Sequence, residues 1–315
     1  MNITVLDAAT LGSDITFEAW QVLGTLTVYQ TTQSEDIIPR LKNADIVILN
    51  KIKMTKEILV SLPKLKLICV TATGYDNIDT AACKKLGIAL CNVKGYSTHS
   101  VAQVTVTLAL TLMSHLPEYS KYVKQGKYTA SGVQNCLTPV FHELYGKTWG
   151  IVGLGNIGKQ VAKVATAFGC NVIGFKRTPD GEYQTTDLET LCKKADIISL
   201  HLPLTEETKE IINRNTLSLM KPNAILINVA RGAITNEQDV ALAIKEGKIG
   251  GFGTDVYSTE PMPWNSPFVS ISEMPNVILT PHMAWGAYES RVRCVNEIAQ
   301  NIKSFLEGKE RNKIV

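Results

Sequence analysis

The sequence lacks a strong surplus of charge and lacks any long hydrophobic run. Its formal net charge is +3, and basic and acidic residues are interspersed rather than gathered in a stripe. That pattern gives no indication of a nucleic-acid or membrane partner. No apolar run reaches the roughly 20 residues that span a bilayer, and no secretion signal precedes the strand-like run Ile3–Leu6. We therefore expect a cytoplasmic protein without a membrane segment, whose mildly positive surface suits an anionic small molecule.

Paired cysteines are also lacking. The seven cysteines are odd in number, scattered along the chain, and never spaced as Cys-x-x-Cys. Most stand in apolar stretches, where buried free thiols are the usual state. This arrangement argues against a disulfide framework and against any metal site of the zinc type, and it favours a reducing compartment.

The order of apolar runs predicts an α/β protein. A chain of 315 residues exceeds what one hydrophobic core organises, so two domains are expected. Short apolar runs alternate with helix-period segments, as in parallel sheets built from βαβ units. The predicted strands of the first part are Ile3–Leu6, Ile46–Leu49, Leu67–Val70 and Ile88–Cys91. The predicted helices between them are Glu35–Lys42, Thr55–Leu62 and Thr80–Leu86.

A second strand series follows a long apolar stretch. Ser100–Met113 is too long for a strand and too short for a membrane span, so it predicts a buried helix, and the polar stretch Gln125–Gln134 follows it. The strands then predicted are Thr148–Val152, Asn171–Phe175, Asp196–Leu200, Ala224–Val229, Gly251–Asp255 and Val277–Thr280. Six strands with intervening helices are what a doubly wound, parallel-sheet dinucleotide-binding (Rossmann) domain needs. A last helix, Tyr288–Leu306, is expected to pack back on the first domain.

The glycine motif GLGNIG marks a dinucleotide site. Gly153, Gly155 and Gly158 stand between the strand Thr148–Val152 and a helical pattern, and that context turns a weak motif into a strong one. The first glycine permits a tight turn, the second lets backbone approach a pyrophosphate, and the third allows close helix–strand packing. The N–H groups around Asn156 and Ile157 would then face the phosphates.

The end of the second strand of this domain bears on the choice of dinucleotide. An NAD site normally has a carboxylate there, whereas this chain has Lys176 and Arg177 in GFKRTP. A cation pairs with a 2′-phosphate, so we favour NADP(H) slightly over NAD(H). The alternative is that both side chains are solvent-facing charges and that NAD binds without the acidic clamp.

Three side chains that suit keto-acid reduction each follow a strand of the second series. Arg231 stands in NVARG, Glu260 in DVYSTEP and His282 in VILTPH. A guanidinium can hold a carboxylate and a carbonyl with two parallel hydrogen bonds, and a histidine can protonate the alkoxide left by a hydride. A carboxylate on the other ring nitrogen fixes the tautomer and favours imidazolium. Taken singly, each residue is better explained as a capping or turn residue, but together the three residues predict a catalytic set. Asp255 is expected to hold the nicotinamide end or to orient a neighbour.

These blocks resemble the D-isomer-specific 2-hydroxyacid dehydrogenase family almost from end to end. TATGYDNID is similar to the family's substrate loop, which implies that Thr73, Gly74 and Tyr75 bind substrate. LHLPLTEET, NVARGAITNE and ILTPHMAW are similar to its cofactor-domain blocks. The resemblance implies catalytic roles for Arg231, Glu260 and His282, with Arg231 also holding substrate, and it implies cofactor contacts from His201, Pro203, Val229 and Ala230.

The resemblance also implies a domain plan and a partner. A smaller flavodoxin-like substrate domain, residues 1–98 and 286–315, would carry the inserted dinucleotide domain, residues 99–285, and two copies would form a homodimer. HMAWGAYESR and the tail look most like the glycerate dehydrogenase or hydroxypyruvate reductase branch, with Trp285 shaping the pocket for a short substrate. This implies reduction of hydroxypyruvate or glyoxylate. The alternatives are a D-lactate-type or other short keto-acid reductase, and a dinucleotide-sensing binding protein related to corepressors.

Overall fold

The computed structural model describes residues 1–178 and 181–315 and divides the chain into two compact units. Unit 1 comprises residues 1–97 and 286–315, and unit 2 comprises residues 98–285. The chain therefore leaves unit 1, builds unit 2 and returns to unit 1. Both units have a parallel sheet covered by helices, so the predicted α/β fold class is confirmed.

The sheet of unit 1 has five parallel strands in the order β2-β1-β3-β4-β5, which is the flavodoxin-like order. The strands are β1 (Asn2–Val5), β2 (Thr25–Val28), β3 (Ile46–Leu49), β4 (Leu67–Val70) and β5 (Ala89–Cys91). β3 and β4 are buried at every position because helices cover both faces. The helical segments are η1 (Ala8–Leu11), α1 (Glu18–Gln21), η2 (Ser34–Asp36), α2 (Ile37–Leu41), α3 (Lys56–Val60), α4 (Thr80–Leu86) and α12 (Tyr288–Leu306).

Strand β2 and helix α1 were missed by the sequence prediction. β2 pairs with β1 in parallel, but it is an edge strand, and none of its four residues is buried. Its threonines and modest hydrophobicity gave no buried-strand signal, because an edge strand packs little of its surface. The core strands of unit 1, in contrast, lie where the apolar runs predicted them, within one residue at each end.

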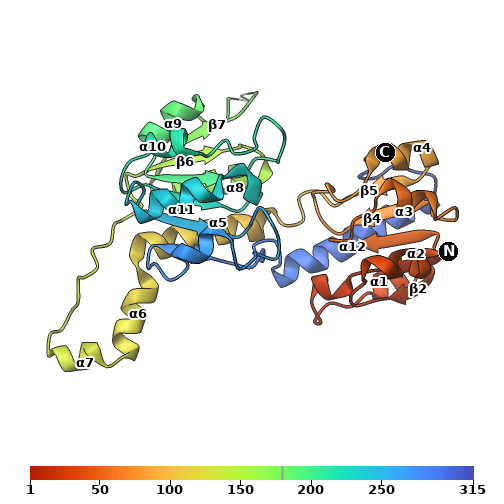
Figure 1. The fold of residues 1–315 in the computed structure, drawn as a ribbon, viewed down its shortest axis with the longest axis horizontal. Helices are drawn as coiled ribbons and strands as arrows, with labels where there is room; N and C mark the ends of the chain where they lie inside the picture. Colours follow the sequence, from red (N-terminus) through yellow and green to blue (C-terminus); the bar gives the residue numbers. More distant parts are fainter. Residues whose placement is uncertain (179–180) are drawn as a thin grey trace. The chain divides into compact units, whose positions relative to one another are not determined.

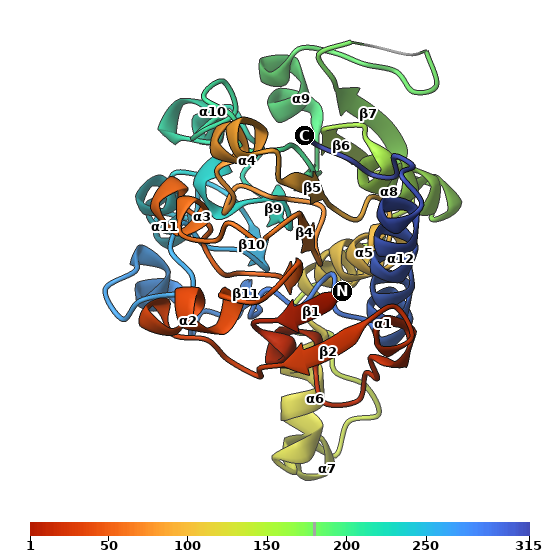
Figure 2. The ribbon, with the colours of Figure 1, turned by 90° about the vertical axis from the view of Figure 1, so that its right-hand side faces the viewer.

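The C-terminal segment completes unit 1. Helix α12 runs beside α1, as Figure 2 shows, and the indole N–H of Trp20 donates to the carbonyl of Val295 at 2.9 Å. The last residues then pair with β5: Ile314 N–H donates to Leu90 O at 2.8 Å, and Lys313 forms an antiparallel bridge with Cys91. The tail therefore covers a sheet edge that would otherwise be exposed.

The sheet of unit 2 has six parallel strands in the order β11-β10-β9-β8-β6-β7. The strands are β6 (Thr148–Val152), β7 (Asn171–Phe175), β8 (Ile197–Leu200), β9 (Ile225–Asn228), β10 (Gly251–Thr254) and β11 (Val277–Leu279). The chain moves from β6 to β7 on one side and then to β8 on the other side of β6. This switch point at the carboxyl ends of β6 and β8 is where doubly wound sheets bind ligands.

Helices on both faces bury this sheet. The predicted buried helix is α5 (Thr98–Ser114), which packs against α8 and β9. The other helical segments are α8 (Asn156–Ala167), α9 (Leu188–Lys194), α10 (Arg214–Ser218), η3 (Gly232–Ile234), α11 (Glu237–Lys245) and η4 (Pro267–Ile271). Within the described residues, no helix is long and apolar enough to cross a membrane.

A projecting segment of unit 2 departs from the sequence prediction. After α5 the chain forms α6 (Leu116–Lys124) and α7 (Lys127–Ser131), whereas only a polar stretch was predicted there. Figure 1 shows both helices standing away from the sheet, followed by an extended return to β6. We call residues 116–143 the arm; none of them is buried. Their exposed apolar side chains include Leu116, Val123, Val133, Leu137, Val140 and Phe141.

Candidate active site

The glycine motif forms a turn between β6 and α8 that requires glycine at its first and third glycine positions. Gly153 has φ +103°, and a Cβ there would lie 2.8 Å from the His201 carbonyl carbon. A Cβ on Gly158 would lie 2.1 Å from the carbonyl oxygen of Gly153. At Gly155, by contrast, a Cβ would meet nothing within 4 Å. The turn is therefore closed at its first and third glycines and open at its second.

The first turn of α8 offers its backbone donors to a ligand. The helix has 12 residues and begins at Asn156, and Gly155 before it provides no side-chain cap. Uncapped N–H groups and the positive end of the helix dipole make such a terminus an anion site. The open side at Gly155 together with these donors fits the pyrophosphate of a dinucleotide. Asn156, Ile157 and Gly158 would hold it.

The two cations that bear on dinucleotide choice directly follow β7. Lys176 is half-buried and Arg177 is exposed. Nearby, Lys159 on the first turn of α8 forms an ion pair with Glu182, which connects this helix to the segment after β7. Positive side chains thus stand at the place where an NAD site normally carries its carboxylate.

His201, which follows β8, lies at the switch point and contacts the buried hydroxyl of Ser199. The Trp149 indole donates to Ser199 Oγ at 3.0 Å, and Ser199 Oγ lies 3.0 Å from His201 Nε2. Nδ1 is buried and has no hydrogen-bond partner within residues 1–178 and 181–315. Burial lowers the pKa of His201 to about 3, so the ring is neutral.

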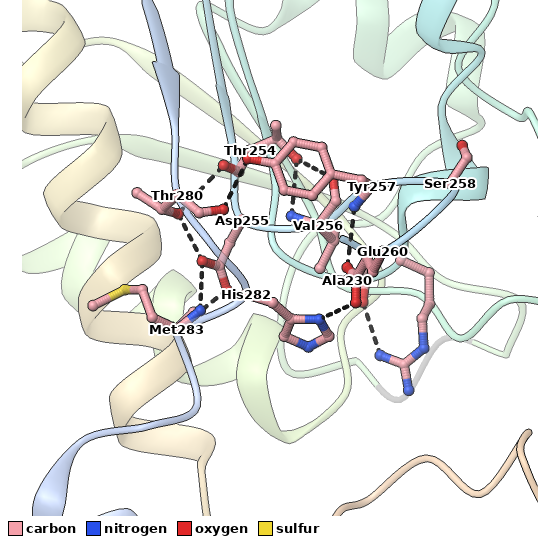
Figure 3. A network of polar contacts seen from close by, with 12 residues as sticks. Ala230, Thr254, Asp255, Val256, Tyr257, Ser258, Glu260, Thr280, His282 and Met283 are labelled. Carbon is pink, nitrogen blue, oxygen red and sulfur yellow. Dashed lines mark hydrogen bonds and ion pairs between the residues drawn. The ribbon is translucent and has the colours of Figure 1, made fainter. Parts of the chain in front are cut away.

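Glu260 and His282 meet in a hydrogen bond. His282 Nδ1 lies 2.7 Å from Glu260 Oε2, as Figure 3 shows, although the residues are 22 positions apart. The His282 side chain is 25% exposed and the Glu260 side chain is 30% exposed, so the pair is open to a substrate. With Glu260 on Nδ1, the other ring nitrogen is the one that can exchange a proton with a bound molecule.

A buried carboxylate holds the segment that carries His282. Asp255 is 1% exposed and accepts hydrogen bonds from the Thr280 hydroxyl at 2.6 Å and from the N–H groups of Met283 and Ala284 at 2.8 Å. Figure 3 shows the contacts of Asp255 with Thr280 and Met283, which precede and follow His282. His282 itself has φ +54°, a backbone conformation that residues other than glycine rarely adopt. The geometry thus gives Asp255 an orienting contact with the histidine segment.

Arg231 stands on a turn that packs against the segment before Glu260. Asn228, which is fully buried, accepts from Ala230 N–H at 3.1 Å and donates to Arg231 O at 2.9 Å. The next residue, Gly232, is so close to the Tyr257–Ser258 backbone that a Cβ there would lie 1.9 Å from the Tyr257 carbonyl carbon. Arg231 Nη1 donates to Ala230 O at 2.8 Å. The turns bearing Arg231 and Glu260 are therefore in direct contact.

The remaining predicted residues fall into two groups. Val229 and Ala230 follow β9, Pro203 follows β8, and Trp285 packs on the unit 2 core. Thr73, Gly74 and Tyr75 belong to unit 1, in the loop after β4, where the Thr73 hydroxyl donates to Val93 O at 2.9 Å and Asn92 Nδ2 donates to Thr73 O at 2.7 Å. The structure thus brings Arg231, Glu260 and His282 together within unit 2 and places the substrate-loop residues on the other unit.

Sequence reasoning missed several residues that build the site. Asn228, Gly232, Glu237 and Tyr257 fix the turns that bear the predicted residues, and the Tyr257 hydroxyl donates to Thr280 O at 2.9 Å. A polar residue ending an otherwise apolar strand was a signal available for Asn228. Glu237 and Tyr257 gave no such signal, because their partners lie more than 20 positions away.

Comparison with known proteins identifies the family. The model of the D-isomer specific 2-hydroxyacid dehydrogenase, NAD binding domain, matches residues 106–284. A glycerate dehydrogenase of Methylorubrum extorquens is 38% identical over 286 residues, which are 90% of each chain. A hydroxypyruvate reductase of Blautia hydrogenotrophica is 34% identical and covers 98% of each chain. The chain belongs to the D-isomer-specific 2-hydroxyacid dehydrogenase family, as its motifs predicted, and is similar to the glycerate dehydrogenase branch.

Two solved structures with the same fold contain a nicotinamide dinucleotide. An acyclic imino acid reductase in complex with NADPH and D-Arg superposes with a TM-score of 0.89 at 31% identity over the whole of both chains. A D-lactate dehydrogenase from Aquifex aeolicus complexed with NAD and lactic acid gives 0.86 at 31% identity over 98% of this chain and 96% of that one. A nicotinamide dinucleotide is thus the ligand class of this fold.

Proposed function

We propose that this protein transfers a hydride between NAD(P)H and C2 of a small 2-keto or 2-hydroxy acid, with hydroxypyruvate and glyoxylate as its preferred keto acids. The observation that carries the proposal is the 2.7 Å contact between His282 and Glu260 beside the turn of Arg231. The similarity to a glycerate dehydrogenase and a hydroxypyruvate reductase supports the choice of substrate.

Each side chain has a defined task in this proposal. The bound reduced nicotinamide supplies the hydride. The Arg231 guanidinium holds the substrate carboxylate and polarises its carbonyl. His282 donates a proton to the developing alkoxide, and in the oxidative direction it accepts that proton. Glu260 holds the imidazole in the tautomer and orientation that this transfer needs.

The dinucleotide is proposed to be NADP(H) in preference to NAD(H). Lys176 and Arg177 supply positive charge at the end of β7, where a carboxylate would repel a 2′-phosphate. The backbone of Gly153, Gly155, Asn156, Ile157 and Gly158 holds the pyrophosphate. His201, Pro203, Val229, Ala230 and Asp255 are the further contacts that we propose for the cofactor.

The two units are proposed to divide the work. Unit 2 is the dinucleotide domain, and unit 1 is the substrate domain, where Thr73, Gly74 and Tyr75 take the substrate carboxylate through backbone N–H groups. Trp285 limits the substrate to a short side chain. We place the protein in the cytoplasm, since free thiols persist in a reducing compartment.

A homodimer formed through the arm is part of the proposal. The arm exposes Leu137, Val140 and Phe141 by 50–70% and buries none of its residues. Exposed apolar surface of this kind marks an interaction site, and closed homodimers are the commonest assembly. Light scattering should give the mass of two chains, and Val140→Glu with Phe141→Glu should give the mass of one.

A spectrophotometric screen of keto acids against both reduced cofactors tests the function. Hydroxypyruvate and glyoxylate should be turned over fastest. A preference of more than tenfold for pyruvate would favour a lactate-type enzyme, a candidate supported by the similarity to a D-lactate dehydrogenase. Dinucleotide binding without turnover of any keto acid would instead favour a dinucleotide-sensing binding protein.

A further inference from the structure

Glu237 holds both ends of the loop that carries Glu260. We call residues 257–266 the Glu260 loop. The N–H of Ser258, near its start, donates to Glu237 Oε1 at 2.7 Å, and the hydroxyl of Ser266, at its end, donates to Glu237 Oε2 at 3.3 Å. One carboxylate therefore joins two points of the chain that flank Glu260.

The carboxylate is itself mounted on a rigid element. Glu237 is the first residue of α11, where the helix dipole favours a negative charge. Val240, Ala241 and Ile244 of this helix lie in the unit 2 core and fix its position. The Asn236 side chain caps the helix by accepting from Asp239 N–H. Glu237 can thus define where the loop lies.

The start of the loop connects Glu237 to the proposed catalytic pair, Glu260 and His282. Gly232 packs against Tyr257–Ser258 from the side of Arg231, so the start of the loop is confined between two elements. Glu260 Oε1 then accepts from Tyr257 N–H at 3.2 Å, which leaves Oε2 to His282. A continuous set of contacts runs from α11 through Ser258 and Tyr257 to Glu260 and His282.

We infer that Glu237 is a positioning residue that sets the place of Glu260 against His282, an inference that rests on the proposed function. It acts through hydrogen-bond geometry and does not touch substrate. A reacting group displaced by about 1 Å can lose about 10²-fold in rate. Loss of Glu237 should therefore lower kcat and leave the Kd of the dinucleotide unchanged.

Three substitutions separate geometry from charge. Glu237→Ala removes both contacts and should lower kcat by about tenfold to 10²-fold. Glu237→Gln keeps an acceptor for Ser258 N–H and places a donor at Ser266 Oγ, so it should restore kcat to within about threefold of the unaltered protein. Glu237→Asp keeps the charge on a shorter side chain, and it should resemble Ala. A result in which Asp restores activity and Gln does not would overturn the inference.

Asp239 provides a matched control on the same turn of helix. Its carboxylate also accepts a backbone N–H from a distant segment, that of Arg214 at 2.8 Å, but this segment carries no candidate active-site residue. Asp239→Ala should leave kcat within about twofold of that of the unaltered protein, while it changes the free energy of unfolding by about as much as Glu237→Ala does. If Glu237→Ala fails to fold, Glu237→Asp and Glu237→Gln still decide the question by their order.

A double-mutant cycle keeps the inference distinct from the function on which it rests. If Glu237 acts through Glu260, Glu237→Ala should change kcat less than twofold in a Glu260→Ala background, whereas independent effects would multiply. Multiplicative losses would overturn the inference and leave the proposed function standing. Unimpaired turnover by Glu260→Ala alone would defeat the proposed function, and this inference with it.

Discussion

The glycine turn and the proposed catalytic cluster of unit 2 are built in opposite ways. The turn is contiguous, and its six residues run from Gly153 to Gly158. It presents backbone N–H groups to a ligand, and its glycines leave room because they have no side chains. The cluster is assembled from three strand ends, and Glu260 and His282 meet across 22 positions of sequence. The glycine turn therefore depends on free space beside its backbone, and the cluster depends on the chemistry and the placement of its side chains.

This difference predicts two kinds of failure. A change in the turn adds atoms where there is no room, so it should affect folding or dinucleotide affinity. A change in the cluster removes a reacting group but leaves the strand ends in place, so it should affect turnover at constant dinucleotide affinity.

The largest effect is expected at the histidine. His282→Ala removes the group proposed to donate the proton and should lower kcat by about 10²–10⁴-fold, the usual contribution of general acid catalysis. Stopped-flow or steady-state assays with hydroxypyruvate would measure it, and fluorescence titration should give an unchanged Kd for the dinucleotide. A loss of less than tenfold would contradict the assignment.

Two glycines of the turn should fail differently. Gly158→Ala forces a Cβ against the Gly153 carbonyl oxygen and should destabilise the protein by about 1–3 kcal/mol. Gly155→Ala meets no protein atom, so its Tm should stay unchanged while the dinucleotide Kd rises by about tenfold, which corresponds to about 1.4 kcal/mol. Thermal melts and titrations on both variants make the comparison. Equal Tm losses would show that the open side of Gly155 is not a ligand cradle.

A smaller effect is expected at the end of β7. Lys176→Asp replaces a cation that favours a 2′-phosphate with a carboxylate that repels it. A hydrogen bond to a charged group contributes about 1.5–3 kcal/mol, so the ratio of kcat/KM with NADPH to that with NADH should fall by at least about tenfold. Ratios that do not change would mean that Lys176 takes no part in selecting the dinucleotide.

A graded effect is expected on stability against pH at the switch point. His201 has a pKa of about 3 in the folded chain and one near 6.5 when unfolded. Between these values the unfolded chain binds a proton that the folded chain does not, so stability is present above pH 6.5 and is lost as pH falls. The slope should be at most about 1.4 kcal/mol per pH unit. Urea unfolding of His201→Gln between pH 5 and 6.5 should show a shallower slope, and an identical slope would argue against a neutral buried ring.

Local patterns predicted much of the fold. The bounds of β6, β7, α4 and α12 follow directly from apolar periodicity and turn residues, because these signals lie within each element. The same reasoning failed for β2 and for the arm. An exposed edge strand carries no core-facing pattern, so the hydrophobicity of β2 does not indicate a strand. The helical period of α6, in which Leu116, Tyr119 and Val123 recur on one face, was overlooked, and none of these residues is buried.

The candidate site divides in the same way. Arg231, Glu260 and His282 were recognisable because each follows an apolar strand, and parallel strands end at one edge of a sheet. Their supports were recognisable only in part. Asp255 was expected to hold the nicotinamide end or to orient a neighbour, and it binds the histidine segment directly. Glu237 was not expected, because it reaches Ser258 across 21 positions and no spacing rule anticipates that contact.

By itself the sequence determined the α/β class, the six-stranded series with its glycine turn, and the residue types available for chemistry. These properties follow from hydrophobic period and backbone conformation, which act over a few neighbouring residues. The tertiary structure alone decided how Glu260 is placed against His282, which carboxylate holds the histidine segment, and which carboxylate holds the loop of Glu260. Such choices depend on how strands and helices pack at a distance, since an acidic residue has the same local preferences whichever partner it finally contacts.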